Sequence, residues 1–284
     1  MPTPSKADAS TPTNGEDREI SPIPTTIGQE ILFELVDGHI ALVTLNRPEK
    51  RNAINGAMTA ALDYLVKRIE SDDHVRVAIL TSSIAAVFCA GADVAEIARN
   101  GADSLSTPDG GFAGFHAAKR NKPWIAAVAG AALGGGCELC LACDMIVAAE
   151  GASFGLPEVK RGLFAAAAGA YRLPKRIPQN IAMELIATGN PISAERAQSL
   201  GLVNRIAPPG QALAEAVRLA GEIAVNAPLA VRESLKLARL ATLRSEDELR
   251  ALSRAAASVV FGSEDAKEGG RAFLERRSPQ WLGR

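Results

Sequence analysis

The first apolar pattern in the chain is a pair of short runs separated by a turn. Residues 30–45 read EILFELVDGHIALVTL, in which two apolar segments flank Asp37 and Gly38. Aspartate followed by glycine between two such segments favours a tight β-turn, so this stretch predicts a β-hairpin. Residues 76–83, RVAILTSS, form another short apolar run and predict a buried strand.

Between these predicted strands the apolar residues change to a helical spacing. Residues 54–72 are apolar at intervals of three and four, at Met58, Leu62, Leu65 and Ile69. Such intervals place the side chains on one face of an α-helix, so the stretch predicts a helix. A further helix is expected after FCAGADV (88–94), where a turn of small residues ends.

The alternation of strands and helices continues through the middle of the chain. WIAAVA (124–129) and MIVAA (145–149) predict strands, and a helix is expected between them, from Gly135 to about Cys143. Residues 101–111 are rich in glycine and serine and predict a mobile loop. This order of elements predicts an α/β core.

The last part of the chain is predicted to be mostly helical from about Ile177 onward. PLAVRESLKLARLA (228–241) and SEDELRALSRAAASVVF (245–261) are both amphipathic. We therefore expect the core to occupy residues 28–205 and a helical extension to occupy residues 206–284.

Composition and charge exclude several classes of function. The 284-residue chain is 47% apolar and 22% charged, and its net charge of −1 creates no overall field that favours nucleic acid or an anionic membrane. No apolar run is long enough to span a bilayer. Residues 1–27 lack an apolar or Arg-rich amphipathic segment and are expected to form a disordered tail rather than a targeting signal. These features predict a cytoplasmic protein.

Motifs for metals and nucleotide phosphates are weak or absent. Cys137, Cys140 and Cys143 spell C-x2-C-x2-C, which resembles the start of an iron–sulfur sequence. No further cysteine with a proline follows, and the same spacing suits small apolar side chains along one helix, which is the interpretation we favour. The histidines are scattered and expected on the surface or in loops, at His39, His74 and His116. No metal is expected, and the glycine motifs of nucleotide sites are missing.

The chemically unusual feature is a glutamate inside an apolar run. WIAAVAGAALGGGCELCLAC (124–143) contains Glu138 as its only ionisable carboxylate. Burial of a lone carboxylate disfavours its charged form and raises its pKa. A carboxyl group in that state can exchange a proton near neutral pH, so Glu138 is a candidate acid–base residue.

Two turns of small residues precede predicted helices. Gly134–Gly136 opens the helix that carries Glu138, and CAGADV (89–94) precedes another. Glycine lets the backbone approach a ligand closely, and the first N–H groups of a helix lack partners. One N–H group from each turn could together bind an oxyanion. The residues alone leave a second interpretation open, in which both segments are only tight turns.

A second candidate carboxylate is Glu158 in SFGLPEVKRG (153–162), where Pro157 fixes the local geometry. Considered alone, Glu158 reads as a solvated loop acid. If it faced Glu138 across a pocket, the two carboxyl groups could share one water and perform acid–base chemistry.

Together these motifs resemble the crotonase superfamily, which includes enoyl-CoA hydratases and isomerases, over about residues 30–284. The matching segments are NRPEKRNAIN (46–55), FCAGADV, ALGGGCEL and the LPE before Val159. The resemblance implies an α/β fold, a crotonase-like spiral of ββα repeats with a C-terminal helical extension used for oligomerisation. It also implies an enoyl-CoA hydratase, a hydro-lyase that forms a homotrimer or a dimer of trimers.

The resemblance further implies a role for each site residue. Ala92 and Gly135 would donate backbone N–H groups to the thioester oxygen as the oxyanion hole. Glu138 would activate water for attack at Cβ, and Glu158 would supply the proton at Cα. No cofactor is implied, because coenzyme A is part of the substrate. The residues implied to contact substrate or CoA are Lys50, Arg51, Ala53, Ala90, Asp93, Val94, Gly134, Phe273 and Arg276.

Several of the implied CoA contacts also have plainer interpretations. Lys50 and Arg51 could be solvated loop charges rather than partners of CoA phosphates. RAFLERR (271–277) would by itself be the end of an ordinary amphipathic helix. In the family pattern, Phe273 and Arg276 fall where a neighbouring subunit approaches the CoA adenine and phosphate.

The chain departs from the family pattern in two places. AAAAGAYRL (165–173) stands where PGAGGTQRL is common, which puts Ala166 and Ala168 at glycine positions, and Ala95 stands where lysine is frequent. The first departure leaves the acyl preference open. Rival activities are therefore a dehydratase acting on a hydroxyacyl-CoA such as carnitinyl-CoA, an enoyl-CoA isomerase, and a catalytically weak acyl-CoA-binding protein.

Overall fold

The computed structural model describes residues 28–284, and the tail expected for residues 1–27 lies outside that range. Its larger sheet has the strand order β1-β2-β3-β7-β9-β12, in which only β1 and β2 pair antiparallel. These strands are β1 (Ile31–Val36), β2 (Ile40–Leu45), β3 (Val77–Ser82), β7 (Trp124–Val128), β9 (Met145–Ala149) and β12 (Arg205–Ala207). The predicted hairpin and the three predicted strands that follow it are confirmed.

A smaller sheet lies beside the larger one, with the order β11-β10-β8-β4. Its strands are β4 (Val87–Cys89), β8 (Ala131–Leu133), β10 (Ser153–Gly155) and β11 (Ile192–Ser193). β4, β8 and β10 run parallel. They contain three residues each, too few for a recognisable alternation of apolar and polar positions, so the sequence pattern alone did not reveal them.

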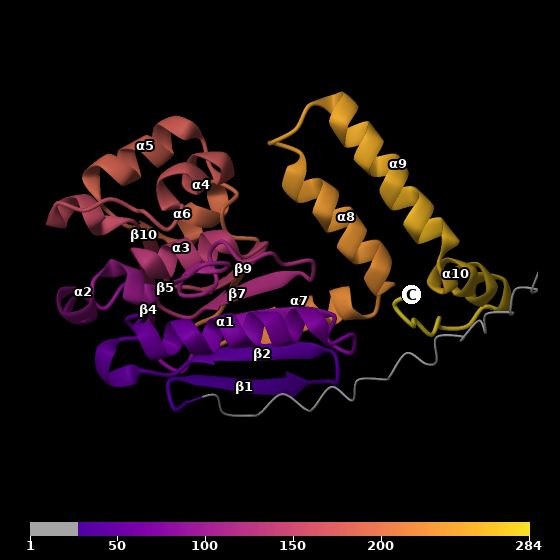
Figure 1. The fold of residues 1–284 in the computed structure, drawn as a ribbon, viewed down its shortest axis with the longest axis horizontal. Coiled ribbons are helices and arrows are strands. Elements are labelled where there is room, and N and C mark those ends of the chain that lie inside the picture. The colour runs from indigo at the N-terminus through magenta and orange to yellow at the C-terminus, as the bar shows by residue number, and fades with distance from the viewer. Residues whose placement is uncertain (1–27) are drawn as a thin grey trace, which may run out of the picture.

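The chain winds through the two sheets as a spiral. In each turn one strand joins the larger sheet, the next joins the smaller sheet, and a helix follows (Figure 1). The turns are β3-β4-α2, β7-β8-α3 and β9-β10-α4, with helices α2 (Val94–Asn100), α3 (Gly135–Ala142) and α4 (Gly169–Arg176). This arrangement confirms the α/β spiral of ββα repeats.

The larger sheet is buried on both faces, as its continuous apolar runs require. One face packs on α1 (Gly56–Ser71), whose buried stripe includes Met58, Leu62, Leu65 and Ile69. The opposite face packs on α7 (Ala212–Ala224) through small residues such as Ala216 and Ala220. The boundary that we expected between residues 205 and 206 lies inside β12. Helix α7, which follows β12, still packs on the core.

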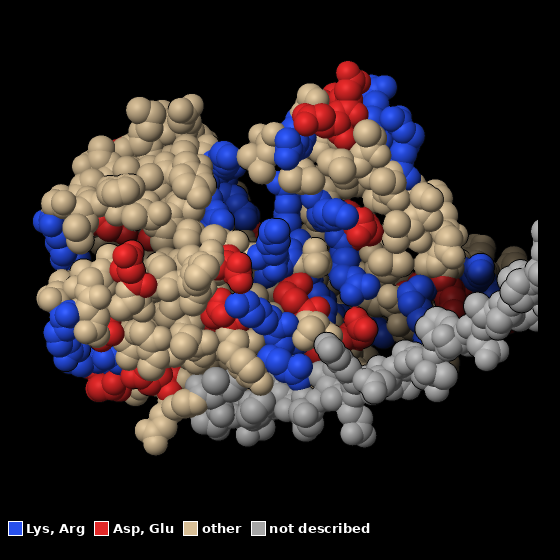
Figure 2. Space-filling view, in the orientation of Figure 1, with Lys and Arg blue, Asp and Glu red and all other residues tan. Residues whose placement is uncertain are grey.

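Three helices then leave the body as an arm: α8 (Pro228–Leu240), α9 (Glu246–Gly262) and α10 (Glu264–Glu275), coloured orange to yellow in Figure 1. Figure 2 shows lysine and arginine side chains gathered where α8 faces the body. Arg239 on α8 forms a bidentate pair with Asp144, at 2.7 and 2.8 Å, and its guanidinium also donates to the carbonyl of Arg120. Asp144 in turn accepts from the N–H of Trp124, so this contact joins the arm to the start of β7.

The remaining elements complete the body. The loop expected at residues 101–111 contains a short 3-10 helix, Ala102–Leu105, and a two-stranded ribbon of β5 (Ser106–Thr107) and β6 (Gly111–Phe112). α5 (Gln179–Thr188) and α6 (Ala194–Ser199) lie before β12. Within residues 28–284, no helix combines the length and the apolar character needed to cross a membrane.

Candidate active site

Three turns meet at one edge of the smaller sheet. β4, β8 and β10 are neighbouring parallel strands, so the segments that follow them leave from the same edge. Those segments carry Ala92 after β4, Gly135 after β8 and Glu158 after β10. The spiral thus brings together three residues that the sequence singled out, although 66 positions separate the first from the last.

Glycine is required where the first two turns touch. A Cβ on Gly91 would lie 3.1 Å from the Gly135 nitrogen, and a Cβ on Gly136 would lie 2.2 Å from the carbonyl oxygen of Cys89. Gly134 caps α3 with a φ of 55°, a conformation that residues with a side chain rarely adopt. The absence of side chains therefore lets the two backbones pack directly against each other.

This packing leaves two N–H groups without internal partners. The N–H of Ile54 donates to the carbonyl of Gly91, and the carbonyl of Ile54 accepts from the N–H of Asp93. The N–H of Ala92, which lies between these two residues, takes no part in this pairing. Gly135 is the first residue of α3, where the helix offers no acceptor. Within the described part of the chain, neither N–H group has a hydrogen-bond acceptor, and both residues line the same cavity.

Glu138 lies in the first turn of α3 and is only 3% exposed. Burial raises its pKa to about 7, and the nearby carboxyl group of Glu158 pushes in the same direction. One carboxyl oxygen accepts a hydrogen bond of 2.8 Å from the N–H of Gly169 at the start of α4. A Cβ on Gly169 would lie 2.9 Å from that same oxygen, so only glycine fits there. The burial of Glu138 and its raised pKa, both expected from the sequence, are confirmed.

Glu158 lies in a 3-10 turn, Pro157–Arg161, directly after β10. It is half-buried, and burial raises its pKa. Its Oε2 is buried without a hydrogen-bond partner among residues 28–284. The interpretation of Glu158 as a solvated loop acid is therefore wrong, because the spiral places it against the turn that opens α3, with its Oε1 beside Gly134.

Both carboxyl groups face a cavity of about 560 Å³ that is lined mainly by apolar side chains. The 101–116 segment supplies one wall of it, and a loop offers no periodic signal from which this position could be predicted. Lining residues outside the set implied by the resemblance are Gly91, Ile97, Ala102, Leu105, Ser106, Gly111, Phe112, His116, Pro157, Arg161, Leu163, Phe164, Ala166 and Ala167. His116 lies in a turn, as expected, but it is half-buried in this wall.

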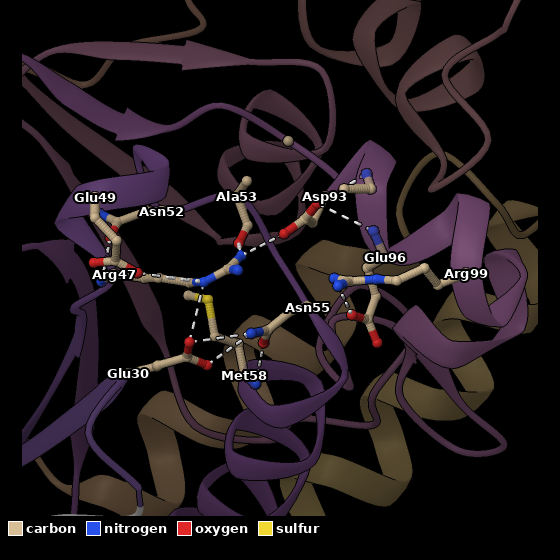
Figure 3. A network of polar contacts seen from close by, with 12 residues as sticks. Glu30, Arg47, Glu49, Asn52, Ala53, Asn55, Met58, Asp93, Glu96 and Arg99 are labelled. Atoms are coloured by element: carbon tan, nitrogen blue, oxygen red, sulfur yellow. Dashed lines mark hydrogen bonds and ion pairs between the residues drawn. The ribbon is translucent and has the colours of Figure 1, made fainter.

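A polar network supports the turn that carries Ala92 (Figure 3). Arg47 pairs with Glu30 at 3.0 Å and with Asp93 at 2.7 Å, and it donates to the carbonyl of Ala53. The carboxylate of Asp93 also caps α2 by accepting from the N–H groups of Ala95 and Glu96. The 46–55 segment therefore holds the turn that carries Ala92 in place.

The residues expected to contact the substrate fall into three groups. Ala90, Val94 and Gly134 line the cavity. Lys50 and Arg51 are exposed, and Ala53 is half-buried, in the segment bonded to the turn that carries Ala92. Asp93 directs its side chain away from the cavity, into the network of Figure 3. Phe273, which is 84% exposed, and Arg276 lie at the end of the arm and do not line this cavity.

The cysteines belong to the core. Cys89, Cys137, Cys140 and Cys143 are all buried and unpaired. Burial raises the pKa of each thiol, which disfavours the reactive thiolate. The interpretation as small buried side chains is confirmed.

Ala168, which stands at a glycine position of the family pattern, has a strained backbone conformation. It precedes α4 with a φ of 83° and is 1% exposed. Neither Ala166 nor Ala168 lies inside a helix, so glycine at these positions would carry no helix penalty. In the left-handed region an alanine is strained by about 1–2 kcal/mol, whereas glycine is not.

We expect Ala168→Gly to be better tolerated than Ala165→Gly by about 1 kcal/mol of unfolding free energy. Both alanines are buried and lie outside helices, so both variants lose a buried methyl group, but only Ala168 has a positive φ. Urea unfolding of the two variants measures this difference. Equal losses at both positions would show that Ala168 is not strained.

Glu138 should also make stability depend on pH. Because folding raises its pKa to about 7, the folded state keeps a proton that the unfolded state releases above about 4.5. The stability linked to that proton is complete below the unfolded pKa and is lost as the pH rises through about 7. The free energy of unfolding of Glu138→Gln, measured relative to that of the unsubstituted protein, should therefore rise by about 2–3 kcal/mol between pH 5 and pH 8. Urea titrations at both pH values test this, with exposed Glu34→Gln as the control.

Comparison with known proteins places this geometry in a family. Residues 36–284 match the family model described as enoyl-CoA hydratase/isomerase. The chain is 38% identical over 253 residues to enoyl-CoA hydratase EchA19 of Mycobacterium tuberculosis, covering 87% of this chain and 94% of that protein. It is 39% identical over 252 residues to carnitinyl-CoA dehydratase of Proteus mirabilis, covering 87% and 96%. A crystal structure of enoyl-CoA hydratase from Mycobacterium tuberculosis H37Rv superposes with a TM-score of 0.86 at 45% identity, covering 90% of this chain and all (100%) of that one.

Proposed function

The chain belongs to the enoyl-CoA hydratase/isomerase family. From that premise we propose that it catalyses the reversible addition of water across the 2,3 double bond of an enoyl-CoA thioester. The observation that carries the proposal is a single cavity lined by two carboxyl groups with raised pKa and by two N–H groups without internal partners. No cofactor takes part, because CoA belongs to the substrate.

The N–H groups of Ala92 and Gly135 bind the thioester oxygen. They polarise the conjugated double bond and stabilise the negative charge that develops on that oxygen during attack. One such donor is worth roughly 3 kcal/mol in other oxyanion holes. Because both donors belong to backbones fixed by turn packing, they need no rearrangement when the charge develops.

The two glutamates move the protons. Glu138 takes a proton from water as that water attacks Cβ, and Glu158 gives a proton to Cα. Burial and mutual repulsion favour one proton on the pair, which matches one base and one acid in the same cavity. The N–H of Gly169 holds one oxygen of Glu138 in place, which leaves the other oxygen for water.

A direct test is hydration of crotonyl-CoA, followed by the loss of enone absorbance. Turnover that requires the purified chain supports the proposal. Saturable binding of crotonyl-CoA without turnover would instead assign a catalytically weak acyl-CoA-binding protein. Migration of the double bond without addition of water would assign an isomerase, an activity that does not account for the second buried carboxyl group at Glu138.

A dehydratase acting on a hydroxyacyl-CoA is the second candidate. It is favoured by the 39% identity to a carnitinyl-CoA dehydratase, and it uses the same two glutamates in the reverse direction. A panel of enoyl-CoA and hydroxyacyl-CoA thioesters with product analysis separates the two candidates, because the preferred substrate identifies the reaction.

We further propose that the protein acts in the cytoplasm as a homotrimer or a dimer of trimers. Large apolar side chains remain exposed on the arm, among them Phe261 and Phe273. A symmetric oligomer would cover such surfaces. In that assembly Phe273 and Arg276 approach the CoA adenine and phosphate bound by a neighbouring subunit.

We expect Arg276→Ala to raise KM for crotonyl-CoA while leaving kcat nearly unchanged. Loss of a contact made equally in the ground state and the transition state has that signature. The defect should shrink with crotonyl-pantetheine, which lacks the adenosine phosphates. An equal defect with both substrates, or a fully active monomer in sedimentation, would contradict this assignment.

A further inference from the structure

His116 is a polar residue of the cavity that the proposed reaction does not use. Four ionisable side chains line the cavity: His116, Glu138, Glu158 and Arg161. The proposed reaction uses the two glutamates for proton transfer, and Arg161 is exposed to solvent. His116 is half-buried beside Phe112, and most of the remaining lining is apolar.

The surroundings hold the His116 residue in place. Its backbone N–H donates to the carbonyl of Phe112, and its own carbonyl accepts from Arg172 at 2.7 Å. The ring packs over Gly111, where a Cβ would lie 2.2 Å from the ring carbon Cε1. A glycine at position 111 is therefore required for the ring to occupy this position.

Neither ring nitrogen of His116 is satisfied by the described part of the protein. Nδ1 is buried and has no hydrogen-bond partner. Nε2 forms no hydrogen bond either, but it is not among the buried unpartnered atoms, so it is the nitrogen that remains accessible on this cavity-lining side chain. Nε2 is therefore the polar atom of this side chain that is free to pair with a group bound in the cavity.

Burial and the neighbouring cations favour the neutral form of the ring. Burial lowers the pKa of His116, and the neighbouring cations of Arg172 and Arg120 lower it further, against a weaker opposite effect of the Phe112 carbonyl. A neutral imidazole has one donor and one acceptor nitrogen. Nε2 is therefore the donor in one tautomer and the acceptor in the other.

We propose that His116 is a specificity-determining residue that selects acyl groups carrying a hydroxyl, which Nε2 binds. This inference rests on the proposed function, because it takes the cavity as the acyl site. A hydroxyl both donates and accepts, so it pairs with Nε2 in either tautomer. A cationic substituent is disfavoured by Arg172 and Arg120, and a purely apolar chain leaves the imidazole unpaired.

Binding of matched acyl-CoA pairs tests the inference without requiring turnover. Saturated butanoyl-, pentanoyl- and hexanoyl-CoA are each compared by calorimetry with the analogue hydroxylated at the terminal carbon. We expect at least one hydroxylated member to bind about 10-fold more tightly than its partner, as expected where a site is built to pair a hydroxyl. His116→Phe should abolish that preference, His116→Gln should retain part of it, and the exposed His74→Phe should leave it unchanged.

The same pairs, as 2,3-enoyl thioesters, report on kcat/KM. A specificity ratio that falls about 10-fold in His116→Phe supports the inference. Equal losses for both members of each pair would place His116 in the common chemistry and overturn it. The inference would also be overturned if the unsubstituted protein showed no preference for a hydroxyl. A preference for dicarboxylyl-CoA that Arg161→Ala removes would overturn it as well. If no thioester is hydrated while the binding preference holds, the proposed reaction fails and His116 keeps its role in recognition.

Discussion

Glu138→Gln is expected to lower kcat for enoyl-CoA hydration by about 10²-fold or more, in line with the contribution of a positioned general base. Glutamine keeps the size of the side chain and an oxygen that can accept the N–H of Gly169, but it cannot take a proton from water. Acyl-CoA binding should be largely retained, because the proposed mechanism assigns the thioester oxygen to backbone N–H groups and not to Glu138. Steady-state kinetics with crotonyl-CoA, together with calorimetry of butanoyl-CoA, measures both quantities.

The pH profile gives this prediction a second signature. Because the pKa of Glu138 is about 7 and its base form is required, kcat/KM for hydration should rise as the pH increases through about 7. In Glu138→Gln that rising limb should be lost from the residual activity, because glutamine does not titrate. Near-normal turnover by Glu138→Gln, or an unchanged limb, would remove Glu138 from the role of base.

The sequence predicted the elements whose periodicity extends over several residues. Helix α1 and strands β3, β7 and β9 lie where their apolar patterns placed them. The strands of the smaller sheet escaped prediction because three-residue segments carry no period. That sheet nevertheless builds the candidate site, because the edge where its parallel strands end brings together the turns that carry Ala92, Gly135 and Glu158.

The candidate site could be predicted only where a local pattern carried the chemistry. Glu138 was evident because it stood alone in an apolar run, and the glycine turns were evident as turns. Glu158 gave no such signal by itself, because its burial depends on β10 pairing with β8, a contact between distant segments. Phe112 and His116 could not be assigned, because the segment that carries them has no period and reaches the cavity only through tertiary packing.

The largest remaining effect is expected at the oxyanion hole. Gly135→Pro removes the N–H group that the proposal assigns to the thioester oxygen, and kcat should fall by about 10²–10³-fold. Proline suits the first position of a helix, where the missing N–H group has no intrahelical partner. The backbone of Gly135 has no positive φ, and α3 should therefore form in the variant. Circular dichroism checks the fold, and crotonyl-CoA kinetics measures the loss.

Gly135→Ala is the matched control, because it adds a Cβ but keeps the N–H group. That Cβ would lie 2.6 Å from the far end of the Phe112 ring, a half-buried side chain that can turn aside. The comparison between proline and alanine therefore removes the effect of the extra carbon that both share. If the proline variant retained kcat within about 10-fold of the alanine variant, the N–H of Gly135 would not be the donor, since loss of such a donor costs about 10² or more elsewhere. The oxyanion would then have to be stabilised from Ala92 and from other groups of the cavity wall.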